Sequence, residues 1–257
     1  MLPKILGIIP ARMASKRLPG KPLTDIEGMP MIAHVYNRSK MAIDLLDVYV
    51  ATCDKEIADY VRSIDGKVIM TKNDVIRSTD RVAEALRKIE AHLQTKIDIV
   101  VMIQGDEPLV NPEMIANSIS PLLIDTDIQI TCLMTEIYEE EEIYDTNAVK
   151  VVVDNFNNAL YLSRSAIPYQ QRGVSGLPHL KKINVSAIRR DFLYNFTSLP
   201  QSPLELVEDI GMLRIVENSM KLKMVMTESY TVSVDTKKDL EIVRNLMKED
   251  LWYNKYK

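Results

Sequence analysis

Residues 4–23, KILGIIPARMASKRLPGKPL, join a short apolar run to a strongly basic loop. The run Lys4–Ile9 is rich in isoleucine and leucine, which is typical of a strand buried on both faces. Four cations follow it within ten residues: Arg12, Lys16, Arg17 and Lys21. A helical spacing of apolar residues begins soon afterwards, at Met31. A buried strand, a charged loop and a helix predict the first unit of an α/β sheet whose ligand-binding edge carries the loop.

The same alternation continues along the first half of the chain. Short apolar runs predict further buried strands at Val48–Thr52, Lys67–Met70, Ile97–Ile103 and Ile128–Thr135. Segments with apolar residues three or four positions apart predict helices at Met31–Met41, Asp54–Ile64, Thr79–Leu93 and Pro112–Ile124. Strands that alternate with helices predict an α/β fold with a mostly parallel sheet and right-handed crossovers.

The pattern changes after Asn147. Two apolar runs, Val149–Val153 and Ala159–Leu162, flank the turn residues DNFNN and predict a hairpin. The remaining chain predicts a loop at Gln170–Pro178, an apolar stretch at Ile183–Ile188, a helix near Pro203–Glu217, a strand at Val225–Asp235 and a helix at Lys237–Leu251. For 257 residues we expect one domain, with a core of about 1–145 and 220–257 and a smaller mixed α/β lobe of about 146–219.

The composition excludes several classes of protein. Hydrophobic residues make up 46% of the chain and charged residues 26%, which excludes global disorder. A net charge of −4 argues against a nucleic-acid or membrane-surface partner, and no apolar run approaches the roughly 20 residues of a membrane span. The two cysteines, Cys53 and Cys132, lack metal-ligand spacing and suggest buried, reduced thiols. We therefore expect a cytoplasmic protein.

Two loops that follow predicted strands carry candidate chemistry. The basic loop can offer cations and backbone N–H groups to a polyphosphate, although it matches neither GxxxxGK[ST] nor GxGxxG. The segment Gln104–Pro108, QGDEP, follows Ile97–Ile103, and Asp106 at that strand end is suited to binding Mg²⁺. Asp235, at a second strand end, is either its partner or the N-cap of the helix that follows.

The segments Ile8–Arg12, Leu18–Leu23 and Gln104–Leu109 resemble the signature of 3-deoxy-manno-octulosonate cytidylyltransferases, the CMP-Kdo synthetases. Shorter motifs continue the resemblance in order: Val50–Thr52, Thr79–Arg81, Asn147–Lys150, Ser163–Arg164, Ser202–Glu205 and Val234–Thr236. The resemblance implies a Rossmann-like sheet of the nucleotidyltransferase type, a smaller dimerisation lobe and dependence on Mg²⁺. It also implies the reaction, in which CTP and the C2 hydroxyl of Kdo (3-deoxy-manno-octulosonate) give a CMP-sugar and pyrophosphate.

The resemblance further implies a role for individual residues. Arg12 and Lys21 would hold the triphosphate beside Ala11, and both would act with Asp106 as the catalytic residues. The residues implied to lie by the cytosine are Arg77, Ser78 and Gln104. Those implied to bind Mg²⁺ are Asp106 and Asp235, and those implied to bind the acidic acceptor are Arg164, Lys182, Ser186 and Glu208.

The acceptor side departs from the family pattern. Members usually carry His-x-Gly-x-Tyr where this chain has KINVS, Lys182–Ser186, and Leu-Glu-Gln-Leu-Arg where it has IGMLR, Ile210–Arg214. Lys182 should make the pocket more cationic, while Ser186 and Gly211 should leave more room unless the loop at Gln170–Pro178 fills it. A site that loses hydrogen-bonding groups loses affinity unless its substrate changes too.

Three hypotheses follow from these departures. The first is a CMP transferase for a Kdo relative or another small acid or phosphonate. The second is a CMP-Kdo synthetase with an altered pocket, and the third is a nucleotide-binding protein without catalysis. The chain keeps all four charged residues that the reaction needs, which are Arg12, Lys21, Asp106 and Asp235. Their presence together argues against the third hypothesis.

Overall fold

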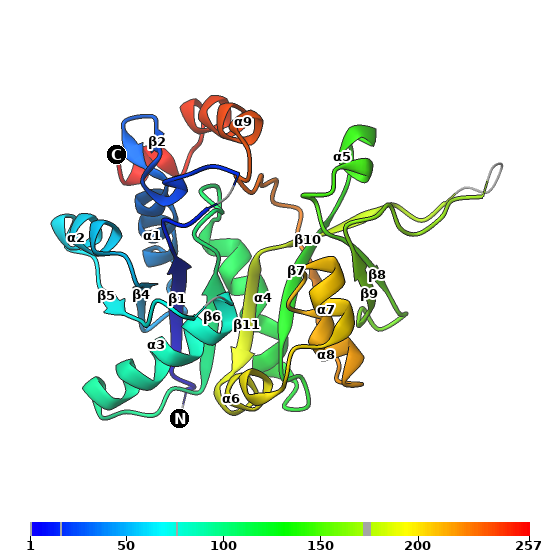
Figure 1. Ribbon diagram of the computed structural model, residues 1–257, viewed down its shortest axis with the longest axis horizontal. Coiled ribbons are helices and arrows are strands. Elements are labelled where there is room, and N and C mark those ends of the chain that lie inside the picture. Colours follow the sequence, from blue (N-terminus) through cyan, green and yellow to red (C-terminus); the bar gives the residue numbers. More distant parts are fainter. Residues whose placement is uncertain (1, 16, 76, 172–175) are drawn as a thin grey trace.

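The computed structural model describes residues 2–15, 17–75, 77–171 and 176–257, and two five-stranded sheets lie side by side in them (Figure 1). The first sheet has the order β11-β6-β1-β4-β5. Its strands are β1 (Ile5–Ala11), β4 (Asp47–Thr52), β5 (Val68–Met70), β6 (Ile99–Ile103) and β11 (Val185–Arg189). All neighbours are parallel except β11, which runs antiparallel to β6. The predicted α/β fold with a mostly parallel sheet is confirmed.

The second sheet is mixed and has the order β12-β7-β10-β8-β9. Its strands are β7 (Thr131–Glu136), β8 (Lys150–Val153), β9 (Ala159–Ser163), β10 (Leu180–Ile183) and β12 (Lys223–Met226). The predicted hairpin is present as β8–β9, and the Asp154 carboxylate closes its turn by accepting from the backbone N–H of Phe156 and Asn158 at 2.9 and 2.7 Å. A bridge between Ile130 and Ile188 joins the two sheets.

Helices cover both faces of the first sheet. The helices are α1 (Met31–Lys40), α2 (Lys55–Ser63), α3 (Ser78–Leu93), α4 (Pro112–Ile124), α5 (Glu140–Tyr144), α6 (Arg190–Ser198), α7 (Pro203–Glu208), α8 (Leu213–Glu217) and α9 (Lys237–Lys248). One buried apolar cluster joins α3 and α6 to the sheets, and another joins α1, α2 and α4 to the opposite face. Because both clusters include side chains of both sheets, the sheets are packed as one body.

Three short elements complete the described fold. A small hairpin of β2 (Asp25–Ile26) and β3 (Met29–Pro30) lies beside α9, and single 3₁₀ turns form η1 (Lys21–Leu23) and η2 (Tyr253–Lys255). A third apolar cluster packs α9 against Leu18 of the basic loop and Val234 of the segment that precedes α9. None of the described helices combines the length and the apolar character that crossing a membrane requires.

Several predicted elements need correction. The stretch Ile183–Ile188 is two strands, because the chain crosses at Asn184 from β10 in the second sheet to β11 in the first. The predicted helix Pro203–Glu217 breaks into α7 and α8 at Asp209, whose φ of 51° is left-handed. The predicted strand Ile128–Thr135 is β7 and lies in the second sheet, and α6 had no predicted counterpart.

The C-terminal part also differs from the prediction. The strand expected over Val225–Asp235 ends early, because β12 stops at Met226 and the chain leaves the sheet toward α9. The second sheet combines strands of both predicted ranges. Its strands β7 and β12 fall in the range predicted for the core, whereas β8, β9 and β10 fall in the range predicted for the lobe. That division into core and lobe stays a prediction.

Candidate functional site

The carboxyl ends of β1 and β6 bring the two candidate loops together. Gly105 permits their close approach, because a Cβ atom there would lie only 3.1 Å from the Pro10 carbonyl oxygen and 3.4 Å from the Ala11 Cβ. Gly20, with a φ of 72°, turns the basic loop into η1, which carries Lys21 back toward β6. Parallel strands end at the same edge of a sheet, which brings the two loops together.

Two adjoining cavities of about 840 and 890 Å³ open at this edge. They share the residues Arg12, Arg17, Ser78, Gln104, Asp106, Asp209 and Asp235. The larger cavity lies under the basic loop and reaches Ala11 and Lys21. The smaller one extends to the second sheet and reaches Arg164, Lys182 and Ser186. Lys16, the remaining cation of the loop, lies outside the described residues.

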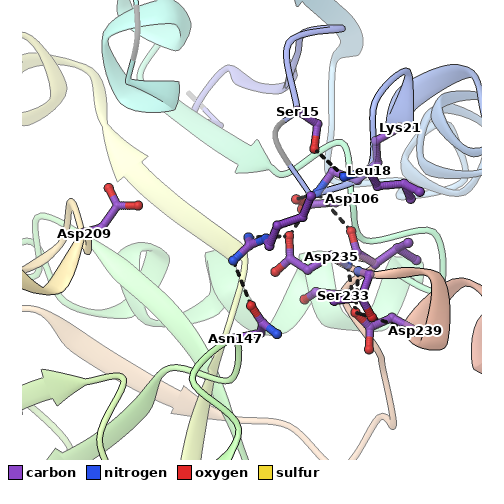
Figure 2. Close-up of polar contacts among 12 residues, drawn as sticks. Ser15, Leu18, Lys21, Asp106, Asn147, Asp209, Ser233, Asp235 and Asp239 are labelled. Atoms are coloured by element: carbon purple, nitrogen blue, oxygen red, sulfur yellow. Dashed lines mark hydrogen bonds and ion pairs between the residues drawn. The ribbon is translucent and has the colours of Figure 1, made fainter.

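The Lys21 ammonium group lies between two carboxylates (Figure 2). Its Nζ donates to Asp106 Oδ2 at 2.7 Å, to Asp235 Oδ1 at 3.1 Å and to the Val234 carbonyl oxygen at 2.9 Å. Burial by itself lowers the pKa of Lys21, but the two carboxylates outweigh it and hold this pKa above its ordinary value. Lys21 is therefore a fixed positive charge at the junction of the two loops.

Asp235 belongs to the same charge cluster. Arg17 Nη2 donates to Asp235 Oδ1 at 2.8 Å, while its Nη1 donates to Asn147 Oδ1 at 2.7 Å. The alternative role of Asp235 as an N-cap is excluded, because Thr236 caps α9 in a capping box with Asp239. Arg17 and Asn147 had no predicted place in the site, although Arg17 was among the cations of the basic loop.

The residues present fit a shared Mg²⁺ site. Asp106 Oδ1 is buried without a hydrogen-bond partner in the described structure, so one carboxylate oxygen is left to bind a ligand. Lys21 Nζ contacts the other oxygen of Asp106, Oδ2, and also Asp235 Oδ1. A single cation can therefore reach both carboxylates. The described residues hold no group of three or more His, Cys, Asp or Glu suited to a metal. Mg²⁺ commonly takes one or two carboxylates and completes its shell with phosphates and water.

Glu107 positions the segment that carries Asp235. Its buried carboxyl group accepts hydrogen bonds from Thr231 Oγ1 at 3.2 Å and from Ser233 Oγ, so it ties the end of β6 to the chain before α9. Burial and the neighbouring Asp106 raise the pKa of Glu107. Sequence reasoning assigned Glu107 no role, and only its place beside Asp106 pointed to it.

The three residues predicted to lie by the cytosine do not all stay together. Ser78 Oγ donates to Gln104 Oε1 at 3.1 Å, so these two side chains meet at the rim shared by the cavities. The Arg77 guanidinium points instead to the chain around α7, where it lies 3.3 Å from Asp209 Oδ1 and 3.4 Å from Glu205 Oε1. Arg77 lines the smaller cavity alone, whereas Ser78 and Gln104 line both, and its place by the cytosine stays a prediction.

Arg164 is held rigidly in the wall of the smaller cavity. Its Nε donates to the Glu208 carbonyl oxygen at 2.8 Å, its Nη1 to that of Thr146 at 2.7 Å and its Nη2 to that of Asp209 at 3.2 Å. Three carbonyl groups thus fix the plane of the guanidinium, whose outer edge borders the cavity. A fixed guanidinium at a cavity wall is suited to binding an acid.

Glu208 supports Arg164 in this structure, and its predicted contact with the acceptor stays a prediction. Its carboxylate accepts from Ser163 Oγ at 2.7 Å and from the Arg164 N–H at 2.9 Å, and Glu208 is not among the residues that line either cavity. Burial raises the pKa of Glu208, but these hydrogen bonds outweigh it and lower the pKa overall. Glu208 therefore supports Arg164 from behind.

The departures at Lys182, Ser186 and Gly211 all lie in the smaller cavity. Lys182 Nζ contacts Asn184 Oδ1, and Ser186 is buried in β11. A Cβ atom at Gly211 would meet no atom within 4 Å, so the glycine leaves open space there. The described residues of Gln170–Pro178 do not line this cavity, whereas 172–175 lie outside the described structure.

Comparison with known proteins agrees with this geometry. The sequence profile of a family described as Cytidylyltransferase matches residues 6–222. The 3-deoxy-manno-octulosonate cytidylyltransferase of Solibacter usitatus is 39% identical over 248 residues, which cover 96% of each chain. The chain belongs to this cytidylyltransferase family. A mitochondrial member from Arabidopsis thaliana is also 39% identical, over 96% of this chain and 84% of the relative.

Solved structures place the chain in the same cytidylyltransferase family. A CMP:2-keto-3-deoxy-manno-octonic acid synthetase in complex with CTP matches with a TM-score of 0.87 and 38% identity, over 96% of this chain and 100% of that one. The 4-diphosphocytidyl-2C-methyl-D-erythritol synthase of Anaerococcus prevotii matches with a TM-score of 0.62 at 12% identity, which shows a shared fold alone.

The buried pair of Glu205 and Arg214 should be essential for stability. Arg214 donates to both Glu205 oxygens at 2.7 Å, and Glu205 is fully buried. Glu205→Ala should lower the free energy of unfolding by about 3–5 kcal/mol, because it leaves the Arg214 charge buried and unpaired. Urea denaturation measures the loss, with Glu241→Ala as the control, since Glu241 pairs with Arg244 on the surface. Equal effects of the two variants would contradict the prediction.

Proposed function

We propose that the protein transfers CMP from CTP to Kdo and releases pyrophosphate. The observation that carries this proposal is the charge cluster of Lys21, Asp106 and Asp235 between a cavity under the basic loop and a second cavity bordered by Arg164. Relatives of the same length, 39% identical, carry the name of this activity. We place the reaction in the cytoplasm, where CTP and Mg²⁺ are available.

The larger cavity is suited to the triphosphate of CTP. Lys21 stands in its wall as a fixed cation, and Arg12 is an exposed side chain at the boundary of both cavities. Charge-assisted hydrogen bonds from such groups are among the stronger polar contacts that a protein can make with phosphate. Ser78 and Gln104 line both cavities, and a base bound there could contact them.

The reaction needs the acceptor hydroxyl in line with the leaving pyrophosphate. The C2 hydroxyl of Kdo loses its proton to solvent as its oxygen attacks the α-phosphorus. An O–P bond forms, and the bond between the α-phosphorus and the bridging oxygen of the β-phosphate breaks, so pyrophosphate leaves. Positioning and charge neutralisation supply most of the catalysis in such a transfer. Lys21 contributes a fixed positive charge near the phosphates, and Arg164 orients the acid from the opposite wall. Mg²⁺, held by Asp106 and Asp235, would offset the charge that develops on the phosphate oxygens.

The nature of the acceptor can be measured directly. Pyrophosphate release should require CTP, Mg²⁺ and Kdo together, and Kdo should give the highest kcat/KM in a panel of 2-keto sugar acids. A higher kcat/KM with a larger acid would indicate that the open space at Gly211 and the cation at Lys182 have changed the acceptor. No release with any acid would contradict the proposed activity.

Asp106 should be required for turnover. Asp106→Asn keeps the size of the side chain but removes the charge that would hold Mg²⁺ and that now pairs with Lys21. We expect kcat to fall by about 10²–10³-fold, the effect of removing a comparable electrostatic group. Steady-state kinetics at saturating Mg²⁺ measure the change, with the exposed Asp127→Asn as the control. Near-normal kcat in Asp106→Asn would remove this carboxylate from the mechanism.

We also propose that the protein is a homodimer that uses the outer part of its second sheet. Figure 1 shows the described chain that follows β9 and precedes β10 projecting from that sheet. Tyr169 and Leu177 on this projection are 88% and 77% exposed, and Leu160 in β9 is 58% exposed. Exposed apolar side chains that gather on one part of a surface mark contact sites. Sedimentation equilibrium should give twice the chain mass of 29.3 kDa, and a monomer at micromolar concentration would contradict this.

A further inference from the structure

Asp209 lies where the acceptor side of the cleft meets the nucleotide side. It borders both cavities, and its side chain is 77% exposed. Figure 2 shows its carboxylate across the cleft from Asp106 and Asp235. Its Oδ1 lies 3.3 Å from Arg77 Nη1, and its Oδ2 lies 4.0 Å from Arg164 Nη2. One carboxylate thus faces two guanidinium groups, and no role for it was predicted from the sequence.

The backbone of Asp209 holds one of these arginines. The residue ends α7 with a φ of 51°, and in this left-handed conformation its carbonyl oxygen accepts from Arg164 Nη2 at 3.2 Å. Asparagine and aspartate tolerate this conformation better than other residues with a side chain. The carbonyl group therefore belongs to the support of Arg164, whereas the carboxylate is a separate feature that can be changed alone.

Neither arginine depends on the Asp209 carboxylate for its position. Arg164 has five N–H groups and donates three of them to backbone carbonyls, so one N–H on each terminal nitrogen is left toward the cavity. The Gln201 side-chain amide lies 2.7 and 2.8 Å from Arg77 Nε and Nη2 and can accept from both with its oxygen turned toward them, and Glu205 lies 3.4 Å from Nε. An exposed ion pair adds little to stability, so another anion can replace the Asp209 carboxylate at small cost.

The charges around the smaller cavity are close to balance. The cations that line it are Arg12, Arg17, Lys72, Arg77, Arg164 and Lys182, and the carboxylates are Asp74, Asp80, Asp106, Asp209 and Asp235. Asp106 and Asp235 are paired with Lys21 and Arg17 beside the nucleotide side. Among these carboxylates, Asp209 is the one within 4.0 Å of both Arg77 and Arg164.

We propose that Asp209 lowers the affinity for the acidic acceptor by competing with it for Arg77 and Arg164. Its carboxylate occupies the position between Arg77 and Arg164 that the carboxylate of the incoming sugar acid takes, and the acid must displace it to bind. The inference rests on the proposed function, because it needs an acidic acceptor. After displacement, the negative charge of Asp209 remains close to the bound acid and weakens its binding.

The test is Asp209→Asn, because asparagine keeps the left-handed backbone and the carbonyl that supports Arg164. We expect the KM for Kdo to fall by roughly threefold to tenfold, since a like charge near the bound acid is removed. The KM for CTP should change less than twofold, and the difference in KM for Kdo should shrink as salt is added. A residue that only supported the fold would not produce this split between the two substrates.

The matched control is Asp59→Asn. Asp59 is an exposed carboxylate that lies 3.3 Å from Arg62 on α2, the same distance as that between Asp209 and Arg77, but it lies outside both cavities. This variant should leave both KM values unchanged, and thermal melting of both variants should match that of the wild type. An unchanged or higher KM for Kdo in Asp209→Asn would overturn the inference alone. A wild-type protein that is inactive with Kdo would overturn the proposed function and the inference together.

Discussion

The site depends on the contact of the Lys21 ammonium group with two carboxylates. Asp106 lies 85 residues and Asp235 lies 214 residues further along the chain, yet both contact the same nitrogen. The contact therefore joins the loop after β1, the end of β6 and the segment before α9. Two carboxylates this close would repel each other without a cation between them. Glu107 reinforces the arrangement, because it ties the end of β6 to the segment that carries Asp235.

A second constraint sets the opposite wall of the cleft. The chain crosses from the second sheet to the first at Asn184, whose carbonyl oxygen accepts from the Gln104 N–H at 3.1 Å. Lys182 and Ser186, on either side of the crossing, are thereby placed beside the end of β6. Because the two large apolar clusters run through both sheets, the wall with Arg164 is fixed relative to the basic loop. The two cavities therefore lie at a defined separation, and group transfer requires such fixed positions for its reactants.

Local patterns in the sequence were sufficient for the four parallel strands of the first sheet and for one half of the site. The helix α4 begins and ends as predicted, at Pro112 and Ile124, because Asn111 caps it and proline suits its first turn. The strands β1 and β6 are apolar runs followed by charged loops, and parallel strands end at one edge. That rule places the loops with Lys21 and Asp106 at one edge, and the structure shows the two side chains in contact.

The other half of the site was decided by tertiary contacts. Arg77 pairs with Asp209, 132 residues away, and Glu208 lies behind Arg164, and neither contact was predicted from the sequence. The break between α7 and α8 at Asp209 and the crossing at Asn184 were also missed, since both lie within continuous apolar patterns. Periodicity shows which face of an element is buried, but the partner of a charged side chain depends on which distant segments fold against it. Only the packed sheets bring those segments together, so only the tertiary structure shows which side chains line the smaller cavity.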